Sequence, residues 1–584
     1  MLFIGILVAS IVWGSAKVAP SPVAVGGMNG HGESTVMMGG ATGGHSGFNK
    51  IKNRITMIIL WYSLMLSWNS IALDQIGSGI GIYSGLWQVT SVTACTDLLL
   101  FFVAAITVML TEVWPSNKVA GGFAGGGLSL GPANSGSQRG GLALAGSRSV
   151  TTGSSSYTLI ILFTTLGMTS LISSYDLVSF FLGIELQSFG LYILATIYRE
   201  SESSTSSGLK YFLLGALSSG FLLLGSSIIY GVTGVTNWDS FYQITSVACS
   251  AAGGAAGSIA PAPFGAGYLD GGANSGGLIM QSQLELSLLI IGVGLLFKIA
   301  AAPFHNWAPD VYDGVPTLVT SWLAVIPKIS LLVFMLELFA GVFWNLQYWS
   351  LLFLISALLS QVIGSVVGLG QYRIKRLLAY SAISHVGFML LGLGINTEQS
   401  IESMMFYLIQ YSLTSINIFY ILLALGNLLE SAQPDVPKYS PLNTISQLKG
   451  QFQTAGGNPL LALCLAISFF SIAGIPPFIG FFAKLKVFYA ATHSGYYMLA
   501  IIAVLTSVIS AAYYLRVIKV ISFDSAPTVP AGSTPAPSAG GTVSASYTIP
   551  YGISWVIALL TLTIVFSPVL LATLPSQPAF IAFI

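Results

Sequence analysis

Long apolar runs alternate with polar or glycine-rich stretches along this chain of 584 residues. A run of about 20 apolar residues is long enough to cross a bilayer as a helix. The pattern predicts about 14 spanning helices, over residues 2–16, 55–73, 94–113, 157–174, 176–198, 209–232, 285–303, 315–340, 347–369, 377–396, 403–429, 459–490, 496–520 and 551–574. We therefore predict an all-α polytopic membrane protein with a single membrane domain over residues 1–584.

Stretches rich in Gly, Ala, Ser and Pro separate some of these runs and lack hydrophobic periodicity, which is typical of flexible loops outside the membrane. They cover residues 18–49, 118–156, 247–281 and 525–548. Their glycine clusters have no preceding strand and no GK[ST], so we interpret them as linkers and not as nucleotide-binding loops. The short run 2–16 resembles a signal peptide, but no basic residue precedes it, and we interpret it as a retained first helix.

The composition agrees with a membrane location. Charged residues make up 7% of the chain, against about 25% in ordinary soluble domains, and hydrophobic residues make up 54%. Cys95, Cys249 and Cys464 lie far apart and form no CxxC, so we interpret them as small core residues and expect no iron–sulfur or zinc site. We expect the lipid bilayer as the surroundings of this chain, and no nucleic acid as a partner.

The 20 Lys and Arg residues are distributed unevenly. When loops are numbered by the helix they follow, fifteen of the 20 lie in odd-numbered loops or at the flanking helix ends, and the other five lie inside or against apolar runs. The even-numbered loops contain none. Under the positive-inside rule, the odd loops face the cytoplasm or matrix, and both termini lie on the opposite side. A miscounted central helix would scramble this pattern, so it supports the helix count.

Lysines at membrane depth are the main chemical signal in the sequence. They are Lys210, Lys298, Lys328, Lys484 and Lys486. A charge at this depth persists mainly where it is paired or faces water. Two of these lysines also stand beside helix-breaking prolines, and broken helices that carry ionisable groups near mid-membrane favour ion or proton transport.

A buried acid suggests a partner for one of these lysines. Glu185 lies in the middle of the run 176–198, where a lone carboxylate would favour its uncharged form. Lys298, in the run 285–303, is equally buried and is the natural partner. One interpretation is a coupled acid–base pair that passes protons. The other is a static ion pair that fixes helix packing, although such pairs often add little stability.

The prolines predict where two of the spanning helices break. Pro303 follows Lys298, and it predicts a break just after the lysine because proline lacks the N–H and clashes with the preceding turn. His305 lies inside this break, where it could titrate near neutral pH or act as a hydrogen-bonding strut. In the run 459–490 the order is reversed, with two prolines before Lys484.

This reversal predicts inverted-topology repeats. The two units would be five-helix repeats over residues 157–340 and 347–520, each with one broken helix.

Three further lysines have less certain roles on sequence grounds. Lys328 follows Pro327 near the centre of the run 315–340, where it serves either a proton path or a buried structural contact. Lys210 opens the run 209–232, so snorkelling to the interface competes with a functional role. Lys486 points to a different face of its helix from Lys484 and favours a packing or interfacial role.

Several stretches together resemble the chain 2 family of antiporter-like membrane subunits of respiratory NADH:ubiquinone oxidoreductase (complex I). They are LGIELQSFGLYIL (182–194), LKYFLLGALSSGFLLLG (209–225), GLLFKIAAAPFHNWAPDVYDGVP (294–316), IKRLLAYSAISHVGFMLLGL (374–393) and SIAGIPPFIGFFAKLKVF (471–488). The PFHNWAPDVYDGVP run is very specific. Chains 4 and 5 of the complex and the multisubunit cation/proton antiporters typically carry PFH.WLP.A…APTPVSA there.

The resemblance implies a proton-translocating subunit coupled to electron transfer from NADH to ubiquinone elsewhere in the complex. Glu185 and Lys298 would form the acid–base pair, Lys328 would link the two halves, and Lys484 would lie in the second broken helix. Lys210 matches a further lysine of the family. No cofactor is implied on this chain, since NAD, FMN, iron–sulfur clusters and ubiquinone would be bound by other subunits. The implied partners are other membrane-arm subunits, especially neighbouring antiporter-like chains.

Two alternatives share many of these features. A stand-alone cation/proton antiporter would have the same fold, but the PDVYDGVP run disfavours it. A purely structural membrane subunit is disfavoured by the intact set of lysines. Scarce charge and long insertions favour the mitochondrial inner membrane over a bacterial plasma membrane.

Overall fold

The computed structural model describes residues 43–71, 79–113, 154–198, 201–252, 275–343, 348–432, 442–452, 458–524 and 551–573. The predicted helix over 2–16 lies outside these residues, as does most of each Gly-rich stretch.

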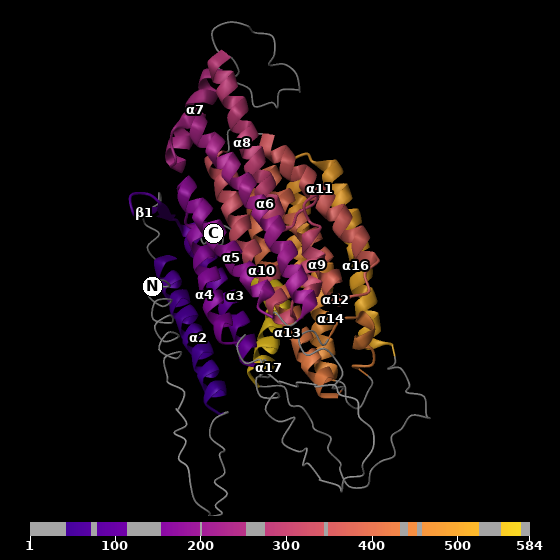
Figure 1. The fold of residues 1–584 in the computed structure, drawn as a ribbon. Helices are drawn as coiled ribbons and strands as arrows, with labels where there is room; N and C mark the ends of the chain where they lie inside the picture. The colour runs from indigo at the N-terminus through magenta and orange to yellow at the C-terminus, as the bar shows by residue number, and fades with distance from the viewer. Residues whose placement is uncertain are drawn as a thin grey trace, which may run out of the picture.

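Helices form nearly all of the described structure and pack side by side in one bundle (Figure 1). They are α2 (Gly43–Ile71), α3 (Ser91–Val113), α4 (Ser154–Ile172), α5 (Leu177–Thr196), α6 (Glu202–Thr233), α7 (Trp238–Ala252), α8 (Ser275–Ile299), α9 (Trp307–Gly314), α10 (Thr317–Met335), α11 (Tyr348–Leu369), α12 (Ile374–Ile395), α13 (Glu398–Ala432), α14 (Pro459–Ala473), α15 (Ile479–His493), α16 (Tyr497–Ser522) and α17 (Tyr551–Thr573). A π-helix, η1 (Leu336–Val342), continues α10, and a short 3₁₀-helix, η2 (Ile445–Leu448), precedes α14.

Among the described residues, nine helices are long and apolar enough to cross a membrane: α3, α5, α6, α8, α10, α11, α12, α13 and α16. Shorter apolar segments lie in α4, α14 and α17. Several helices are longer than the apolar runs that predicted them. For example, α2 begins at Gly43 and α8 at Ser275, because a helix can continue past the apolar run into polar sequence once its first turns are formed.

A small β-hairpin departs from the all-α prediction. Strands β1 (Ile80–Ile82) and β2 (Trp87–Val89) pair antiparallel, with Ile80 opposite Val89. Gly85, with φ +84°, adopts the left-handed backbone that the turn requires. The strands are too short to produce a recognisable alternation of hydrophobic residues.

Two helices are broken, at the positions where prolines predicted it. Helix α8 ends at Ile299, one residue after Lys298, and the chain resumes as α9 at Trp307. Helix α14 ends at Ala473, and α15 begins at Ile479. The short helix α9 was not predicted, since its eight residues include Pro309 and carry no long apolar run.

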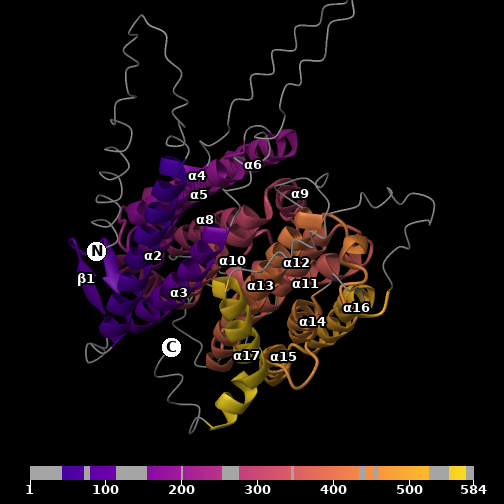
Figure 2. The same cartoon turned by 90° about the horizontal axis from the view of Figure 1, so that it is seen from below.

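Helix α10 lies at the centre of the bundle. All of its residues are buried, including Lys328. Helices α2, α3, α4 and α5 lie on one side of it and α11, α12 and α16 on the other, as both views show (Figures 1 and 2). Pro327 lies within α10 without ending it. A central helix that contacts both halves is well placed to connect them.

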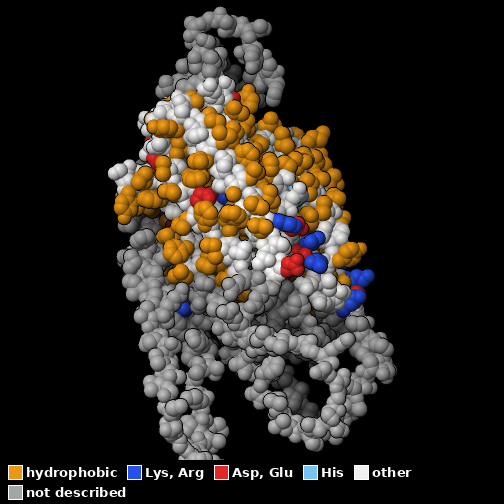
Figure 3. All heavy atoms as spheres, in the orientation of Figure 1, with side chains coloured by type: hydrophobic (Ala, Val, Ile, Leu, Met, Phe, Trp, Pro, Cys, Tyr) orange, Lys and Arg blue, Asp and Glu red, His pale blue; other side chains and the backbone are white. Residues whose placement is uncertain are grey.

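The outer surface of the bundle is strongly apolar. Large side chains such as Leu209, Leu213 and Leu217 are more than half exposed, and Figure 3 shows hydrophobic side chains covering most of the described face. Charged side chains gather at its lower border (Figure 3). A soluble protein would not expose so much contiguous apolar surface, so this face fits contact with lipid or with other membrane subunits.

Candidate functional site

The structure brings Glu185 and Lys298 together inside the bundle. Lys298 Nζ lies 3.6 Å from Glu185 Oε1, and both side chains are largely buried. Lys298 also donates a hydrogen bond to Ser188 Oγ at 2.7 Å and lies 3.5 Å from the Tyr192 hydroxyl. The buried ammonium group therefore has one carboxylate and two hydroxyl groups as neighbours. Because the dielectric is low here, a change of charge on Glu185 or Lys298 strongly alters the proton affinity of the other.

Local sequence explains how this pair is positioned. Asp176 caps the N-terminus of α5 by accepting the Val178 N–H at 2.9 Å, which places Glu185 near the middle of the helix. Ser188 and Tyr192 follow Glu185 at intervals of three and seven residues, so they lie on the same helix face. The structure thus adds Ser188 and Tyr192 to the site. Sequence analysis missed them, although their spacing from Glu185 is visible in the sequence.

The end of α8 is secured by α9. The indole Nε1 of Trp307 donates to the Phe297 carbonyl at 3.0 Å, and Ala301 N donates to the Leu296 carbonyl at 3.0 Å. These bonds satisfy carbonyls that the helix end would otherwise leave open. Since Lys298 follows Phe297 directly, the break holds its ammonium group in the last turn, where a helix dipole favours a cation.

His305 lies in the break, as its position after Pro303 predicted. It is half-buried, and its backbone carbonyl accepts the Ala308 N–H at 3.0 Å, which helps to start α9. In the described part of the chain, no hydrogen bond or ion pair links its imidazole to Lys298. The described contacts favour neither of its two predicted roles.

Lys328 is fully enclosed by the bundle. Its Nζ lies 6.0 Å from the ring centroid of Tyr312 on α9 and 5.7 Å from that of Tyr411 on α13. Within the described residues no carboxylate forms an ion pair with it. Two residues later in α10, Ser330 donates to Gln187 Oε1 at 3.1 Å, which links α10 to the helix that carries Glu185. Lys328 is therefore a buried cation stabilised by aromatic faces.

His385 is a buried residue that sequence analysis missed. Its Nδ1 lies 2.7 Å from the Tyr407 hydroxyl, and its Nε2 lies 3.1 Å from the Tyr514 hydroxyl. It is 3% exposed and lies within electrostatic range of both Lys328 and Lys484. A histidine with a hydrogen-bonding hydroxyl on each ring nitrogen can accept a proton on one side and release it on the other.

Lys484 lies in α15, just after the second break. Its Nζ donates to the Ala473 carbonyl at 2.9 Å, at the C-terminal end of α14, and lies 5.7 Å from the Phe388 ring. Lys486, two residues later, instead donates to Glu402 Oε1 at 2.6 Å. The two lysines therefore lie in different surroundings, as their spacing in a helix predicted.

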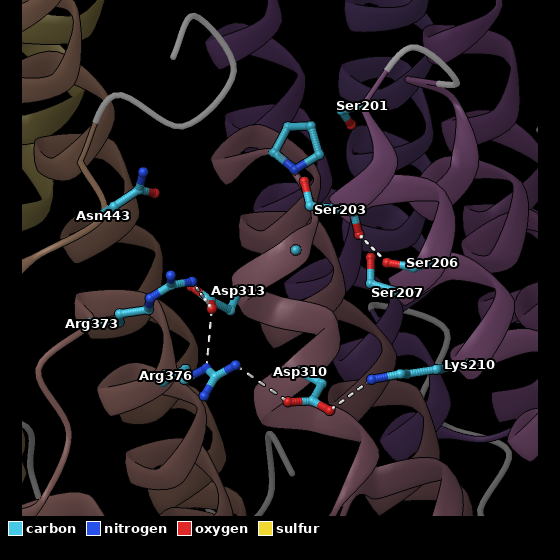
Figure 4. Close-up of a pocket in the computed structure, with 12 residues that line it drawn as sticks. Ser201, Ser203, Ser206, Ser207, Lys210, Asp310, Asp313, Arg373, Arg376 and Asn443 are labelled. Atoms are coloured by element: carbon cyan, nitrogen blue, oxygen red, sulfur yellow. Dashed lines mark hydrogen bonds and ion pairs between the residues drawn. The ribbon is translucent and has the colours of Figure 1, made fainter. Parts of the chain in front are cut away.

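Lys210 lies apart from this buried set. Because α6 begins at Glu202, Lys210 is about two turns inside the helix, yet its side chain is 59% exposed. It forms an ion pair with Asp310 of α9 at 3.2 Å (Figure 4). The exposed position agrees with an interfacial lysine, and its partner was not foreseen.

The buried titratable side chains thus extend from Glu185 and Lys298 in the first half of the bundle, through Lys328 in α10 and His385 in α12, to Lys484 in the second broken helix. Among the described residues, no three His, Cys, Asp or Glu side chains gather closely enough to hold a metal ion. Two broken helices and buried lysines in both halves define the class of antiporter-type polytopic membrane proteins.

Comparison with known proteins agrees with this class. Residues 174–510 match the family described as NADH:quinone oxidoreductase/Mrp antiporter, TM. The chain is 52% identical over 477 residues to NADH-ubiquinone oxidoreductase chain 2 of Rhizopus oryzae, covering 81% of this chain and 82% of the relative. It is 37% identical over 371 residues to NADH-quinone oxidoreductase subunit N of Rhodospirillum rubrum, covering 63% and 68%. The chain therefore belongs to the NADH-ubiquinone oxidoreductase chain 2 family, within the NADH:quinone oxidoreductase/Mrp antiporter family.

Solved structures share the fold. A chain of respiratory complex I from Thermus thermophilus aligns with a TM-score of 0.62 at 24% identity, covering 98% of this chain and 99% of that one. A chain of the Mrp complex from Dietzia sp. aligns with a TM-score of 0.67 at 17% identity, covering 100% and 94%. The antiporter-like fold and the multi-pass membrane character predicted from the sequence are confirmed.

Proposed function

We propose that this chain is a proton-translocating antiporter-like subunit of respiratory NADH:ubiquinone oxidoreductase, which is an H⁺-translocating enzyme. The observation that carries the proposal is the series of buried titratable groups from Glu185 to Lys484, which passes through the central helix α10. Membership of the chain 2 family supplies the assignment to this enzyme. Electron transfer would take place on other subunits, which would bind NAD, FMN, iron–sulfur clusters and ubiquinone.

The proposed mechanism is electrostatic. A proton that reaches the Glu185–Lys298 pair would change its net charge, and this change would alter the proton affinity of Lys328 because charges interact strongly at low dielectric. His385 would then pass the proton from Lys328 toward Lys484, since its two ring nitrogens contact separate hydroxyl groups.

The proposed topology has 14 spanning helices and two inverted five-helix repeats, over residues 157–340 and 347–520. It is supported by the charge asymmetry of the loops and by the opposite order of lysine and break in the two halves. We also propose a location in the mitochondrial inner membrane, beside other antiporter-like subunits of the membrane arm. The eukaryotic relatives support this location.

A native gel tests the assignment to the enzyme. Membranes solubilised in mild detergent are separated on the gel, stained for NADH dehydrogenase activity and probed for this chain. Migration within a very large active band is expected. A small, inactive band under gentle conditions would instead indicate a stand-alone cation/proton antiporter.

A matched pair of variants tests the lysine route. Lys484→Met removes a buried cation from the proposed route, whereas Lys486→Met removes a cation paired with Glu402 outside it. Both variants are compared for proton pumping in reconstituted vesicles after assembly has been checked on the native gel. The proposal expects a large loss only in Lys484→Met. Normal pumping by an assembled Lys484→Met enzyme would contradict it and would favour a structural role.

A further inference from the structure

A polar pocket of about 400 Å³ lies between α6, α9 and α12, and none of Lys298, Lys328 and Lys484 lines it. Charged residues line it together with serines of the first turns of α6 (Figure 4). The charged residues are Lys210, Asp310, Asp313, Arg373 and Arg376. Three cations against two carboxylates leave the pocket with one net positive charge.

The two carboxylates pair with the three cations but leave some of the N–H donors of each cation without a partner among the pocket carboxylates. Asp313 is 6% exposed and accepts from Arg373 Nη1 at 2.5 Å and from Arg376 Nε at 3.0 Å. Asp310 bridges Arg376 Nη2 at 3.5 Å and Lys210 Nζ at 3.2 Å. A guanidinium has five N–H donors and an ammonium has three, so each cation keeps donors for a further partner.

The cations also remain open to that partner. The side chains of Lys210, Arg373 and Arg376 are 59%, 56% and 41% exposed. Ser203 and Ser206 also line the pocket, and the Ser206 hydroxyl donates to the Ser203 carbonyl at 3.2 Å. Oriented guanidinium groups and an ammonium group are the groups that bind phosphate.

The surface beside the pocket indicates which phosphate compound fits. Lys210 lies next to a lipid-facing surface of α6, where Leu209, Phe212 and Leu213 are 58%, 43% and 58% exposed. Charged side chains meet the apolar surface at this border of the bundle (Figure 3). The pocket also lies on the side of the bundle that carries the basic loops, where anionic lipid headgroups bind basic pockets between membrane helices.

We propose that this pocket binds the headgroup of an anionic phospholipid, whose acyl chains lie along the exposed apolar face of α6. Lys210 and Arg376 contact the phosphate, Asp313 keeps Arg376 in position, and Asp310 reduces the net positive charge of the pocket. A zwitterionic lipid fits less well because its ammonium group offsets the attraction. Lipid binding is measured without proton transport, so the proposal stands or fails separately from the proposed function.

Photo-labelling of the assembled complex tests the proposal. The complex is delipidated and reconstituted in phosphatidylcholine vesicles that contain a small fraction of phosphatidylglycerol with a photoreactive acyl chain. Labelled peptides are mapped by mass spectrometry, with photoreactive phosphatidylcholine as the reference probe. The proposal expects labelling of α6 around Leu209–Leu213 that is stronger with the anionic probe. Equal labelling by both probes, or none on α6, would overturn it.

Two charge variants with opposite expected effects on labelling distinguish a change in lipid binding from misfolding. Lys210→Gln should lower labelling about fivefold, the effect of one basic residue near an anionic surface. Asp310→Asn should raise labelling, because it leaves three cations against one carboxylate. Lys449→Gln is the matched control, since Lys449 forms an exposed ion pair with Asp524, 3.6 Å apart, and does not line the pocket. Equal labelling in Lys210→Gln and Lys449→Gln, or a fall in Asp310→Asn, would contradict the proposal.

Competition separates a lipid from a free anion. Excess unlabelled phosphatidylglycerol should abolish the labelling, whereas inorganic phosphate at matched ionic strength should leave it unchanged. Displacement by inorganic phosphate would mean that the pocket takes a soluble anion, and the lipid proposal would be wrong.

Discussion

The two broken helices place a lysine in similar backbone surroundings but give it different partners. Lys298 precedes its break, and Lys484 follows its break, yet each ammonium group lies at the C-terminal end of the first helical segment. The partial negative charge of a helix C-terminus favours a cation at both sites. Only Lys298 has a carboxylate beside it, from Glu185, whereas Lys484 is bound by the Ala473 carbonyl.

Because their partners differ, the proton affinities of the two lysines respond to changes of charge on different groups. The proton affinity of Lys298 depends on the charge of Glu185, which can itself change. A backbone carbonyl cannot change its charge, so the proton affinity of Lys484 changes only with the charge of other groups, such as nearby His385. We therefore expect the first break to be an adjustable site, in which the proton affinity of Lys298 changes with the charge of Glu185. The second break would accept a proton in response.

The largest expected effect comes from Lys298→Met, which removes the cation of the adjustable site. Proton pumping should fall about tenfold, because a proton carrier on the route is lost. Pumping is measured by fluorescence quenching in reconstituted vesicles. The native gel serves as the control for assembly, and an assembled variant that pumps normally would remove Lys298 from the route.

Glu185→Gln should have a smaller effect on pumping, about fivefold, which corresponds to a loss of ~1 kcal/mol. The variant keeps the shape of the side chain, and Ser188 still accepts from Lys298, so only the anion is removed. Pumping is compared with that of Glu402→Gln, which removes the anion beside Lys486 outside the route. Equal effects of the two variants would mean that the contrast between the two breaks is wrong.

Gly474→Ala tests the backbone of the second break. Gly474 has φ +84°, and an added Cβ would lie 2.8 Å from Lys484 Cδ. The variant should destabilise the protein by ~1 kcal/mol, the cost of a left-handed conformation for a residue with a Cβ atom. The measurement is the midpoint temperature for thermal inactivation of NADH:quinone turnover. An unchanged midpoint would show that this turn tolerates a side chain.

Ala300→Gly is the reciprocal change in the first break and should have the smallest effect. Ala300 already has φ +65°, so glycine relieves strain there but also gains freedom in the unfolded chain. The same midpoint temperature should change by the equivalent of less than ~1 kcal/mol, because the loss of a buried methyl group offsets the relief of strain. A fall of the size expected for Gly474→Ala would mean that the Ala300 side chain makes a stabilising contact.

Local signals in the sequence were sufficient for much of the bundle. Apolar runs near the length of a bilayer predicted the spanning helices, because the hydrocarbon core sets their length. Pro303 predicted the end of α8 because it cannot continue the helical hydrogen bonds. The β-hairpin and the short helix α9 gave no such signal, since each is too short for a periodic pattern. Helix α7 has no apolar run long enough to span a membrane.

The partners of the site residues depend on contacts between distant parts of the chain. Lys298 and Ser188 lie 110 residues apart, and His385 and Tyr514 lie 129 residues apart. Buried lysines could be found in the sequence because a charge inside an apolar run is exceptional. A histidine beside apolar residues is less conspicuous, and its contacts with Tyr407 and Tyr514 depend on how α12, α13 and α16 meet.

By itself, the sequence determined that this chain crosses the membrane many times, where its helices break and which cations lie inside. These properties depend on hydrophobicity and backbone chemistry over a few turns. Only the tertiary structure decided that Glu185 faces Lys298, that His385 contacts two tyrosine hydroxyls, and that Lys210 borders a polar pocket. The physical reason is that such contacts depend on the packing of whole helices, which the pattern within any single helix does not specify.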